Sequence, residues 1–243
     1  MPPREFVLVH GMSHGAWAWE RLTPLLERRG HRVVPVELPG HGRRAHERGR
    51  AAIDAYGRAV ADAMASAGVT SAVLVGHSMG GVVIQRAAEL AANRIAHLVF
   101  LAAVVMPRGS SLLGAHLPPA SRALFRGLAA SGGGVVQYSA AMEHARWYGD
   151  LAPGDPRLVA ALTRLTPQPL RPWSERLDLE RFWTLDLPRT YIRCLRDAAV
   201  TAAHGAAYAR RLGVVPVDMD TAHCPMVSAP DALAALLDKI PNR

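Results

Sequence analysis

The sequence predicts an α/β fold in which a mostly parallel sheet is covered by helices on both faces. Short runs of β-branched and small apolar residues alternate with longer segments whose apolar residues recur at helical spacing. This alternation is typical of βα units, which bring parallel strands side by side. The chain has 243 residues and 50% of them are hydrophobic, which suits one domain with a large core.

The first hundred residues contain regular βα units. Each expected strand is short and apolar, as expected of strands buried on both faces, and each expected helix ends near a glycine or at a change of pattern. The expected strands are 5–10, 31–36, 72–75 and 95–103, and the expected helices are 16–28, 53–67 and 82–90.

The rhythm breaks from about residue 107 to residue 185, where prolines recur and the helical pieces are short. The glycine triplet 132–134 is interpreted as a flexible linker. The pattern then resumes with strands at 189–195 and 214–217 and helices at 202–212 and 230–240. We therefore expect a single domain over residues 1–243, with an insert at about 107–185 that forms a small, mainly helical cap over the active site.

A Gly-x-Ser-x-Gly motif, Gly76 to Gly80, lies between an expected strand and an expected helix. A strand that turns directly into a helix strains the backbone of the apex residue, and flanking glycines let the two elements close around it. The motif in this context predicts a nucleophile elbow with Ser78 as the nucleophile.

A serine hydroxyl needs a base to take its proton, and the base needs a third group to orient it. On this topology the order along the chain is serine, acid, histidine. Asp197 follows a late strand, and His223 follows the last one, so we expect these two to complete a triad. The alternatives are acids at Asp186, Asp218 and Asp220 and a histidine at His204.

An oxyanion hole requires two preorganised donors. The N–H of Met79 is expected to be the first, because it opens the helix after the serine. The N–H of Met12 is expected to be the second, because Gly11 leaves room for the loop after the first strand to turn inward.

Several functional classes are disfavoured. The net charge is +8, but the arginines are spread along the chain and no nucleic-acid motif accompanies the cluster 43–50. No metal-ligand spacing, phosphate loop or dinucleotide motif is present, so we expect no metal and no cofactor. The longest apolar run has about half the length that a membrane-spanning helix needs. The first residues lead directly into an expected strand, so we expect no secretory leader. These features favour a cytoplasmic protein that acts on a small-molecule ester without binding nucleic acid or a membrane. We expect a monomer or a homodimer.

Several segments together resemble the α/β-hydrolase superfamily, and more narrowly its branch of plant methyl esterases, hydroxynitrile lyases and related bacterial esterases. The resemblance covers nearly the whole chain and is weakest at about 108–146. The segments that carry it are 10–19, 38–42, 76–81, 166–172, 191–197 and 223–228. The resemblance supports Asp197 as the acid and implies the α/β-hydrolase fold.

Two positions separate the chemistries of this branch. The lyases typically have threonine after the first histidine and lysine after the catalytic histidine, whereas this chain has Gly11 and Cys224. The resemblance therefore implies an esterase, although Cys224 also departs from the methionine common in the esterases. The expected apolar wall of the substrate pocket consists of Trp17, Val104, Met106, Trp147 and Leu170, next to Gly11.

Taken together, these observations predict a serine esterase that cleaves a small to medium carboxylic ester through an acyl-enzyme. Two alternatives remain open at this point, because one fold hosts many reactions. The first is a non-hydrolytic lyase, cyclase or decarboxylase of a biosynthetic pathway. The second is a ligand receptor that retains the triad.

Overall fold

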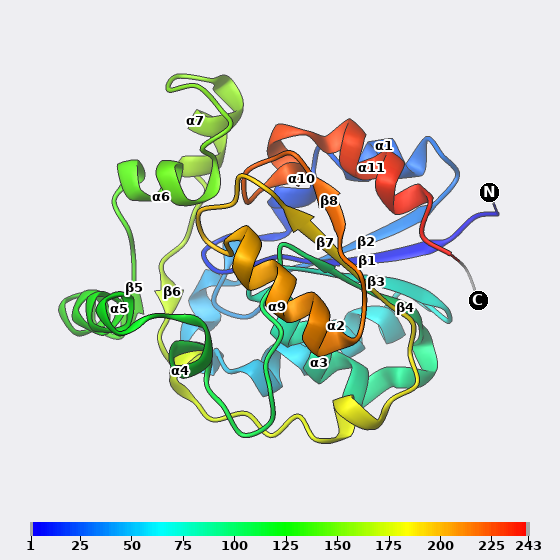
Figure 1. Ribbon diagram of the computed structural model, residues 1–243, viewed down its shortest axis with the longest axis horizontal. Helices are drawn as coiled ribbons and strands as arrows, with labels where there is room; N and C mark the ends of the chain where they lie inside the picture. Colours follow the sequence, from blue (N-terminus) through cyan, green and yellow to red (C-terminus); the bar gives the residue numbers. More distant parts are fainter. Residues whose placement is uncertain (1, 242–243) are drawn as a thin grey trace.

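A computed structural model describes residues 2–241 (Figure 1). Six strands form a fully parallel sheet in the order β2-β1-β3-β4-β7-β8. The strands are β1 (Glu5–Val9), β2 (Arg32–Val36), β3 (Ala72–His77), β4 (Ile95–Leu101), β7 (Arg189–Cys194) and β8 (Val217–Met219). The predicted fold class is therefore confirmed.

Helices cover both faces of the sheet (Figure 1). α1 and α11 pack together on one face, and α2 and α3 pack together on the other. Every residue of β3 is buried as a result, which explains its run of small and β-branched side chains. The α-helices outside the segment between β4 and β7 are α1 (Thr23–Glu27), α2 (Ile53–Ser66), α3 (Gly80–Ala91), α9 (Ala202–Leu212), α10 (Pro225–Ser228) and α11 (Pro230–Asp238). Short 3₁₀ helices are η1 (Ala16–Trp19), η2 (Gly42–Arg50), η3 (Ala92–Arg94) and η4 (Arg181–Thr184).

Some predicted boundaries are wrong. The helix expected over 16–28 is divided into η1 and α1, because Pro24 lacks an N–H and a continuous helix would clash with its ring. The strand expected over 95–103 ends at Leu101, where Ala102 takes a φ of +44°. The last strand begins at Val217 rather than residue 214, and Val215 is 88% exposed.

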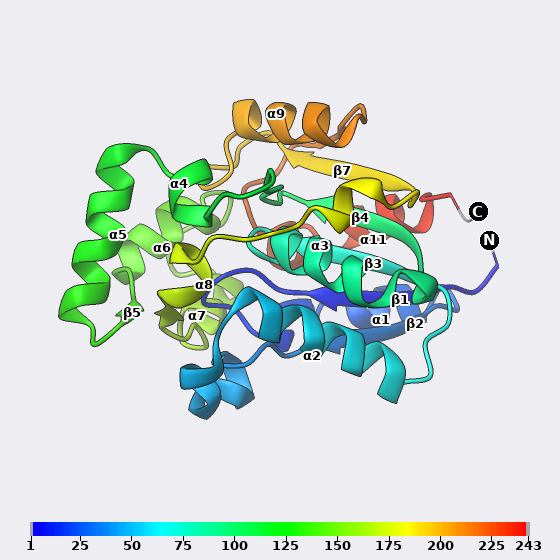
Figure 2. The ribbon, with the colours of Figure 1, turned by 90° about the horizontal axis from the view of Figure 1, so that it is seen from below.

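The part of the segment between β4 and β7 that runs from α4 to α8 lies beyond the carboxyl ends of the strands, and the residues after α8 return alongside the sheet to β7 (Figures 1 and 2). It contains α4 (Leu112–His116), α5 (Pro119–Ser131), α6 (Ala140–Trp147), α7 (Pro156–Leu162), α8 (Arg171–Ser174) and an antiparallel pair of β5 (Val135–Val136) with β6 (Gln168–Pro169). The glycine triplet is not a free linker. The N–H groups of Gly132 and Gly134 donate to the carbonyls of Leu128 and Ala129 and so close the end of α5.

The strand order places a switch point beside β1. The chain runs from β1 to β2 on one side, and β3 lies on the other side of β1. The loops that follow β1 and β3 therefore diverge from neighbouring strands, and such crevices at the carboxyl edge are where ligands bind in open α/β sheets. Within the described residues, no helix has both the length and the apolar character needed to cross a bilayer.

Candidate active site

The turn from β3 into α3 carries Ser78 on a strained backbone. Its φ is +55°, in the left-handed region that non-glycine residues rarely adopt. The approach of strand and helix requires the flanking glycines: a Cβ on Gly76 would lie 2.5 Å from the carbonyl oxygen of Gly80. A Cβ on Gly80 would lie 2.7 Å from the carbonyl oxygen of Val9. The G-x-S-x-G spacing thus permits a turn that other residues would prevent.

His223 and Asp197 form a buried pair. The Nδ1 atom of His223 lies 2.6 Å from Oδ2 of Asp197, and the two residues are 1% and 6% exposed. The other carboxylate oxygen, Oδ1, accepts the N–H groups of Ala199 at 2.7 Å and Val200 at 2.8 Å. With its Nδ1–H donated to Asp197, a neutral His223 presents Nε2 as its basic atom.

The elbow is tied directly to the loop that carries His223. The Nε2–H of His77, the residue before Ser78, donates to the carbonyl oxygen of His223 at 2.9 Å. The two imidazole rings lie 4.6 Å apart between centroids. Burial and the neighbouring His223 lower the pKa of His77 well below its usual range, so the ring is a neutral donor at this position.

Asp150, in the turn between α6 and α7, supports the same loop. Its Oδ2 atom accepts the N–H of Ala222 at 2.9 Å and the hydroxyl of Ser228 at 2.8 Å. Asp150 therefore holds residues before and after His223, and the elbow holds the carbonyl of His223 itself. No sequence pattern pointed to Asp150, since a lone aspartate in a proline-rich loop reads as a turn former.

The loop after β1 passes close to the serine. A Cβ on Gly11 would lie 2.8 Å from Cβ of Ser78 and 3.2 Å from the carbonyl oxygen of His77, so only a glycine fits. The N–H groups of Met12 and Met79 make no hydrogen bond with any residue in 2–241. Both are thus available as donors beside the elbow.

Two histidines orient the peptides of this loop. The Nδ1–H of His10 donates to the Gly11 carbonyl at 2.8 Å, and its Nε2 accepts the N–H of Leu38 at 3.2 Å. The Nδ1–H of His14 donates to the Met12 carbonyl at 2.7 Å. Because burial lowers the pKa of both rings, to about 4 for His14, each donates from one nitrogen and accepts at the other.

His14 also meets two groups near His223. The hydroxyl of Tyr148 donates to its Nε2 at 2.7 Å, and the Sγ atom of Cys224 lies 3.6 Å from the same nitrogen. Burial raises the pKa of the Cys224 thiol well above its usual range, so the group is a thiol and not a thiolate. This observation disfavours Cys224 as a nucleophile.

The expected wall residues fall into different environments. Val104 and Met106 are buried just after β4, and Trp147 is buried with its ring 5.3 Å from that of His14. Leu170 is half-buried next to β6. Their role in binding a substrate stays a prediction.

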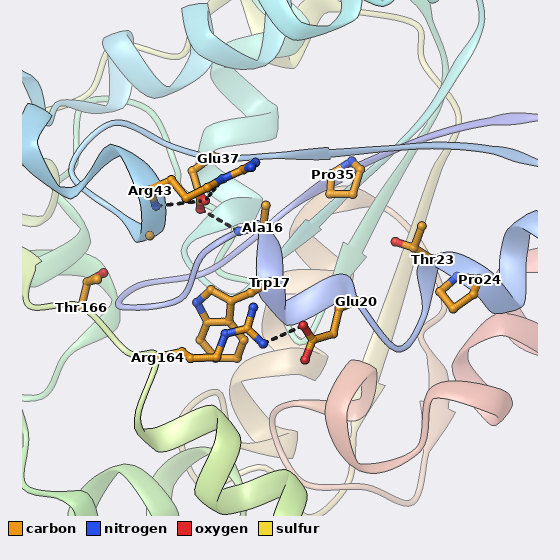
Figure 3. Close-up of a pocket in the computed structure, with 11 residues that line it drawn as sticks. Ala16, Trp17, Glu20, Thr23, Pro24, Pro35, Glu37, Arg43, Arg164 and Thr166 are labelled. Carbon is orange, nitrogen blue, oxygen red and sulfur yellow. Dashed lines mark hydrogen bonds and ion pairs between the residues drawn. The ribbon is translucent and has the colours of Figure 1, made fainter.

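Trp17 lies on the outer side of His14. One ring face stacks on His14 at 5.4 Å, and the guanidinium of Arg164 lies 4.9 Å from the indole centroid. Trp17 and Arg164 line an open groove of about 680 Å³. Figure 3 shows their side chains there, with Arg164 paired to Glu20. None of the residues of the expected triad lines this groove, and the role of Trp17 in binding a substrate stays a prediction.

Comparisons with known proteins agree with this architecture. A sequence model of the alpha/beta hydrolase family matches residues 6–236. The chain is 38% identical over 113 residues to a probable esterase, PIR7A, of Oryza sativa, and this match covers 45% of the chain and 42% of that protein. It is also 38% identical over 126 residues to a carbendazim hydrolyzing esterase of a Nocardioides species, covering 50% of the chain and 52% of that protein. The matched segments thus span about half or less of these curated relatives.

A solved structure extends the likeness to the whole chain. An extracellular alpha/beta-hydrolase from a Paenibacillus species superposes with a TM-score of 0.90 at 26% identity, with 98% of each chain covered. That enzyme is described as sharing structural and functional homology with the tobacco salicylic acid binding protein 2. On the family match and the shared architecture, the chain belongs to the alpha/beta hydrolase family.

Proposed function

We propose that the chain is a serine esterase that cleaves a small to medium carboxylic ester through an acyl-enzyme. The observation that carries the proposal is the buried His223–Asp197 pair, 2.6 Å apart, on a loop hydrogen-bonded to the residue before a serine with φ of +55°. The esterases among its relatives support the reaction class.

In the first half-reaction, the hydroxyl oxygen of Ser78 attacks the ester carbonyl while Nε2 of His223 takes the proton. Asp197 holds the Nδ1–H of His223 and stabilises the imidazolium that forms. Its other oxygen is occupied by two backbone N–H groups, so the carboxylate is oriented before the reaction begins. The imidazolium then gives its proton to the departing alcohol.

The carbonyl oxygen becomes an oxyanion as the serine attacks. The N–H groups of Met12 and Met79 receive it, and donors fixed in advance stabilise the developing charge without reorganising. In the second half-reaction His223 activates a water molecule, which attacks the acyl carbonyl and releases the acid.

The segment 107–185 acts in this proposal as the cap that limits the size of the ester. The position of α4 to α8 beyond the carboxyl ends of the strands supports that role (Figure 2). The space at Gly11 favours hydrolysis over the lyase alternative. A threonine there would bring its Cβ to 2.8 Å from Cβ of Ser78, so this loop has no room for the hydroxyl side chain of the lyases.

The test measures hydrolysis of p-nitrophenyl acetate by the wild type and by Ser78→Ala. Loss of the nucleophile lowers kcat on the order of 10⁶-fold, and the wild type incorporates one fluorophosphonate label, at Ser78. Asp197→Asn keeps the nucleophile but favours the wrong imidazole tautomer, and it lowers kcat by about 10⁴-fold.

Ser131→Ala is the matched control, because Ser131 lies on α5 and its hydroxyl donates to two carbonyls of its own helix. Its kcat equals that of the wild type. Equal activity of wild type and Ser78→Ala would overturn the proposal. Labelling of Ser78 without ester turnover, over a panel of acyl and alcohol sizes, would favour the receptor or the non-hydrolytic enzyme.

A further inference from the structure

Ser13, next to the proposed donor Met12, has a strained backbone. Its φ is +61°, in the left-handed region that a non-glycine residue keeps only where the surroundings impose it. Ser13 is buried, and it lies in the loop after β1 rather than in the elbow. The residues that impose this conformation therefore bear on the geometry of the oxyanion hole.

Both polar groups of the Ser13 backbone bond to one distant segment. The N–H of Ser13 donates to Oε1 of Gln168 at 3.3 Å. The carbonyl of Ser13 accepts the N–H of Thr166 at 2.8 Å and is 3.3 Å from its hydroxyl oxygen. The strained residue is thus held on both sides by residues 166–168, in and just before β6.

Gln168 is itself fixed. Its residue is 0% exposed, and its Oε1 also accepts the Nε2–H of His41 at 3.0 Å. Its Nε2 donates to the Pro169 carbonyl at 3.0 Å. A buried amide whose oxygen accepts from two donors is held in place, because any movement would leave both buried donors unpaired.

These contacts complete the set that orients the loop. The Gly11 and Met12 carbonyls are held by His10 and His14, and both polar groups of Ser13 are held by residues 166–168. The N–H of Met12 is left without a partner in the described part of the chain. The Gly11–Met12 peptide is held at its own carbonyl by His10, and the Met12–Ser13 peptide that follows is held by His14 and Gln168. The N–H of Met12 therefore keeps its direction.

We propose that Gln168 and Thr166 are positioning residues of the oxyanion hole: through the strained Ser13 they aim the N–H of Met12 at the reacting carbonyl. The inference rests on the esterase function proposed above. In this proposal residues 166–168 of the cap affect the reaction rate by orienting the oxyanion donor, in addition to any contact with the substrate. The same segment contains the Thr-Pro-Gln-Pro stretch that the sequence analysis noted only as a resemblance.

Three variants of the full chain test this. Gln168→Met keeps the volume but removes the acceptor, Gln168→Asn retracts the amide by one methylene, and Gln168→Glu retains an acceptor oxygen. We measure kcat and KM for p-nitrophenyl acetate and the Ki of an aryl trifluoromethyl ketone, whose serine adduct carries an oxyanion. Loss of one oxyanion donor costs about 10²–10³-fold in kcat, so a misaimed donor costs about 10–10²-fold.

The expected result is a fall in kcat for Gln168→Met and Gln168→Asn with KM changed less than about threefold, and a rise in the ketone Ki by the same factor as the fall in kcat. Gln168→Glu recovers most of kcat.

The control is Gln85→Met, because Gln85 is equally buried and also holds a loop backbone, through two bonds to Met106. It loses thermal stability without changing the ratio of ketone Ki to KM.

Other outcomes separate the two proposals. A Gln168→Met or Gln168→Asn variant that loses stability while keeping kcat and ketone Ki would overturn this inference alone. So would a parallel change in KM and ketone Ki, which indicates a distorted substrate pocket. A wild type without Ser78-dependent turnover would overturn this inference together with the esterase function.

Discussion

The elbow at residues 76–80 and the loop at residues 10–14 both contain a serine with positive φ, and they are held in different ways. The elbow is shaped by close approach of backbone to backbone, which the absent Cβ atoms allow: Gly76 packs against its own helix, and Gly80 packs against Val9 of β1. The loop is shaped by side chains, two from its own histidines and others from residues 166–168. One turn depends on the steric fit of its backbone, and the other depends on hydrogen bonds to its backbone from side chains and from residues 166–168.

This difference predicts two kinds of failure. A substitution that alters the elbow makes strand and helix collide, so it damages folding. A substitution that alters the supports of the loop leaves the backbone path intact but frees a donor, so it damages the rate. The predictions that follow test this division, starting with the largest expected effect.

Gly76→Ala should be the most damaging change. The added Cβ would lie 2.5 Å from the carbonyl oxygen of Gly80, and neither backbone can yield without opening the turn. We expect a loss of about 3 kcal/mol or more in the free energy of unfolding, measured by urea denaturation. Gly127→Ala is the control, since a Cβ at this position in α5 meets nothing within 4 Å, and it stabilises by about 0.5–1 kcal/mol. A Gly76→Ala protein as stable as the wild type would contradict the account of the elbow.

His10→Leu should lower kcat by about 10–10²-fold, because the Gly11–Met12 peptide loses the donor that orients its carbonyl. KM should change little, since binding of the carbon chains of the ester does not use the Gly11–Met12 peptide. Circular dichroism checks that the variant is folded, and steady-state kinetics separate the two constants. If kcat stays at the wild-type value, the loop is held by its backbone alone.

The neutral histidines of the loop should make the protein sensitive to acid. The pKa of His14 is about 4 in the folded state against 6.5 for an ordinary histidine, so between these values the unfolded chain binds the extra proton. Stability therefore falls as pH drops from 6.5 toward 4, by about 1.4 kcal/mol per pH unit for this group. His14→Gln should flatten the dependence of unfolding free energy on pH by that amount. An unchanged slope would show that His14 titrates alike in both states.

Ser13→Gly should have the smallest effect on stability, within about 1 kcal/mol, because relief of the strain at φ of +61° is offset by the greater freedom of glycine in the unfolded chain. Ala102→Gly, at φ of +44°, is the matched control away from the loop. Thermal melts compare the two. A loss well above 1 kcal/mol at Ser13 alone would mean that its side chain has a structural role beyond the backbone.

The same division explains what could be predicted from the sequence. The order of strands and helices and the elbow were predictable, because periodicity, glycine spacing and chain order all report local structure. The pairing of His223 with Asp197 was expected from topology. The supports from Asp150 and Gln168 were not predictable, since a polar residue in an irregular segment gives no sign of which distant peptide it meets.

The two cysteines have a practical consequence. Cys194 at the end of β7 and Cys224 beside His223 are 1% and 0% exposed, and burial raises the pKa of both, to about 12 for Cys194. A maleimide or an aromatic disulfide added to the native protein therefore finds no reactive sulfur until the chain opens. Mass spectrometry of the modified peptides would time two local openings in one experiment, one at the sheet and one at the loop that carries His223, without any engineered label.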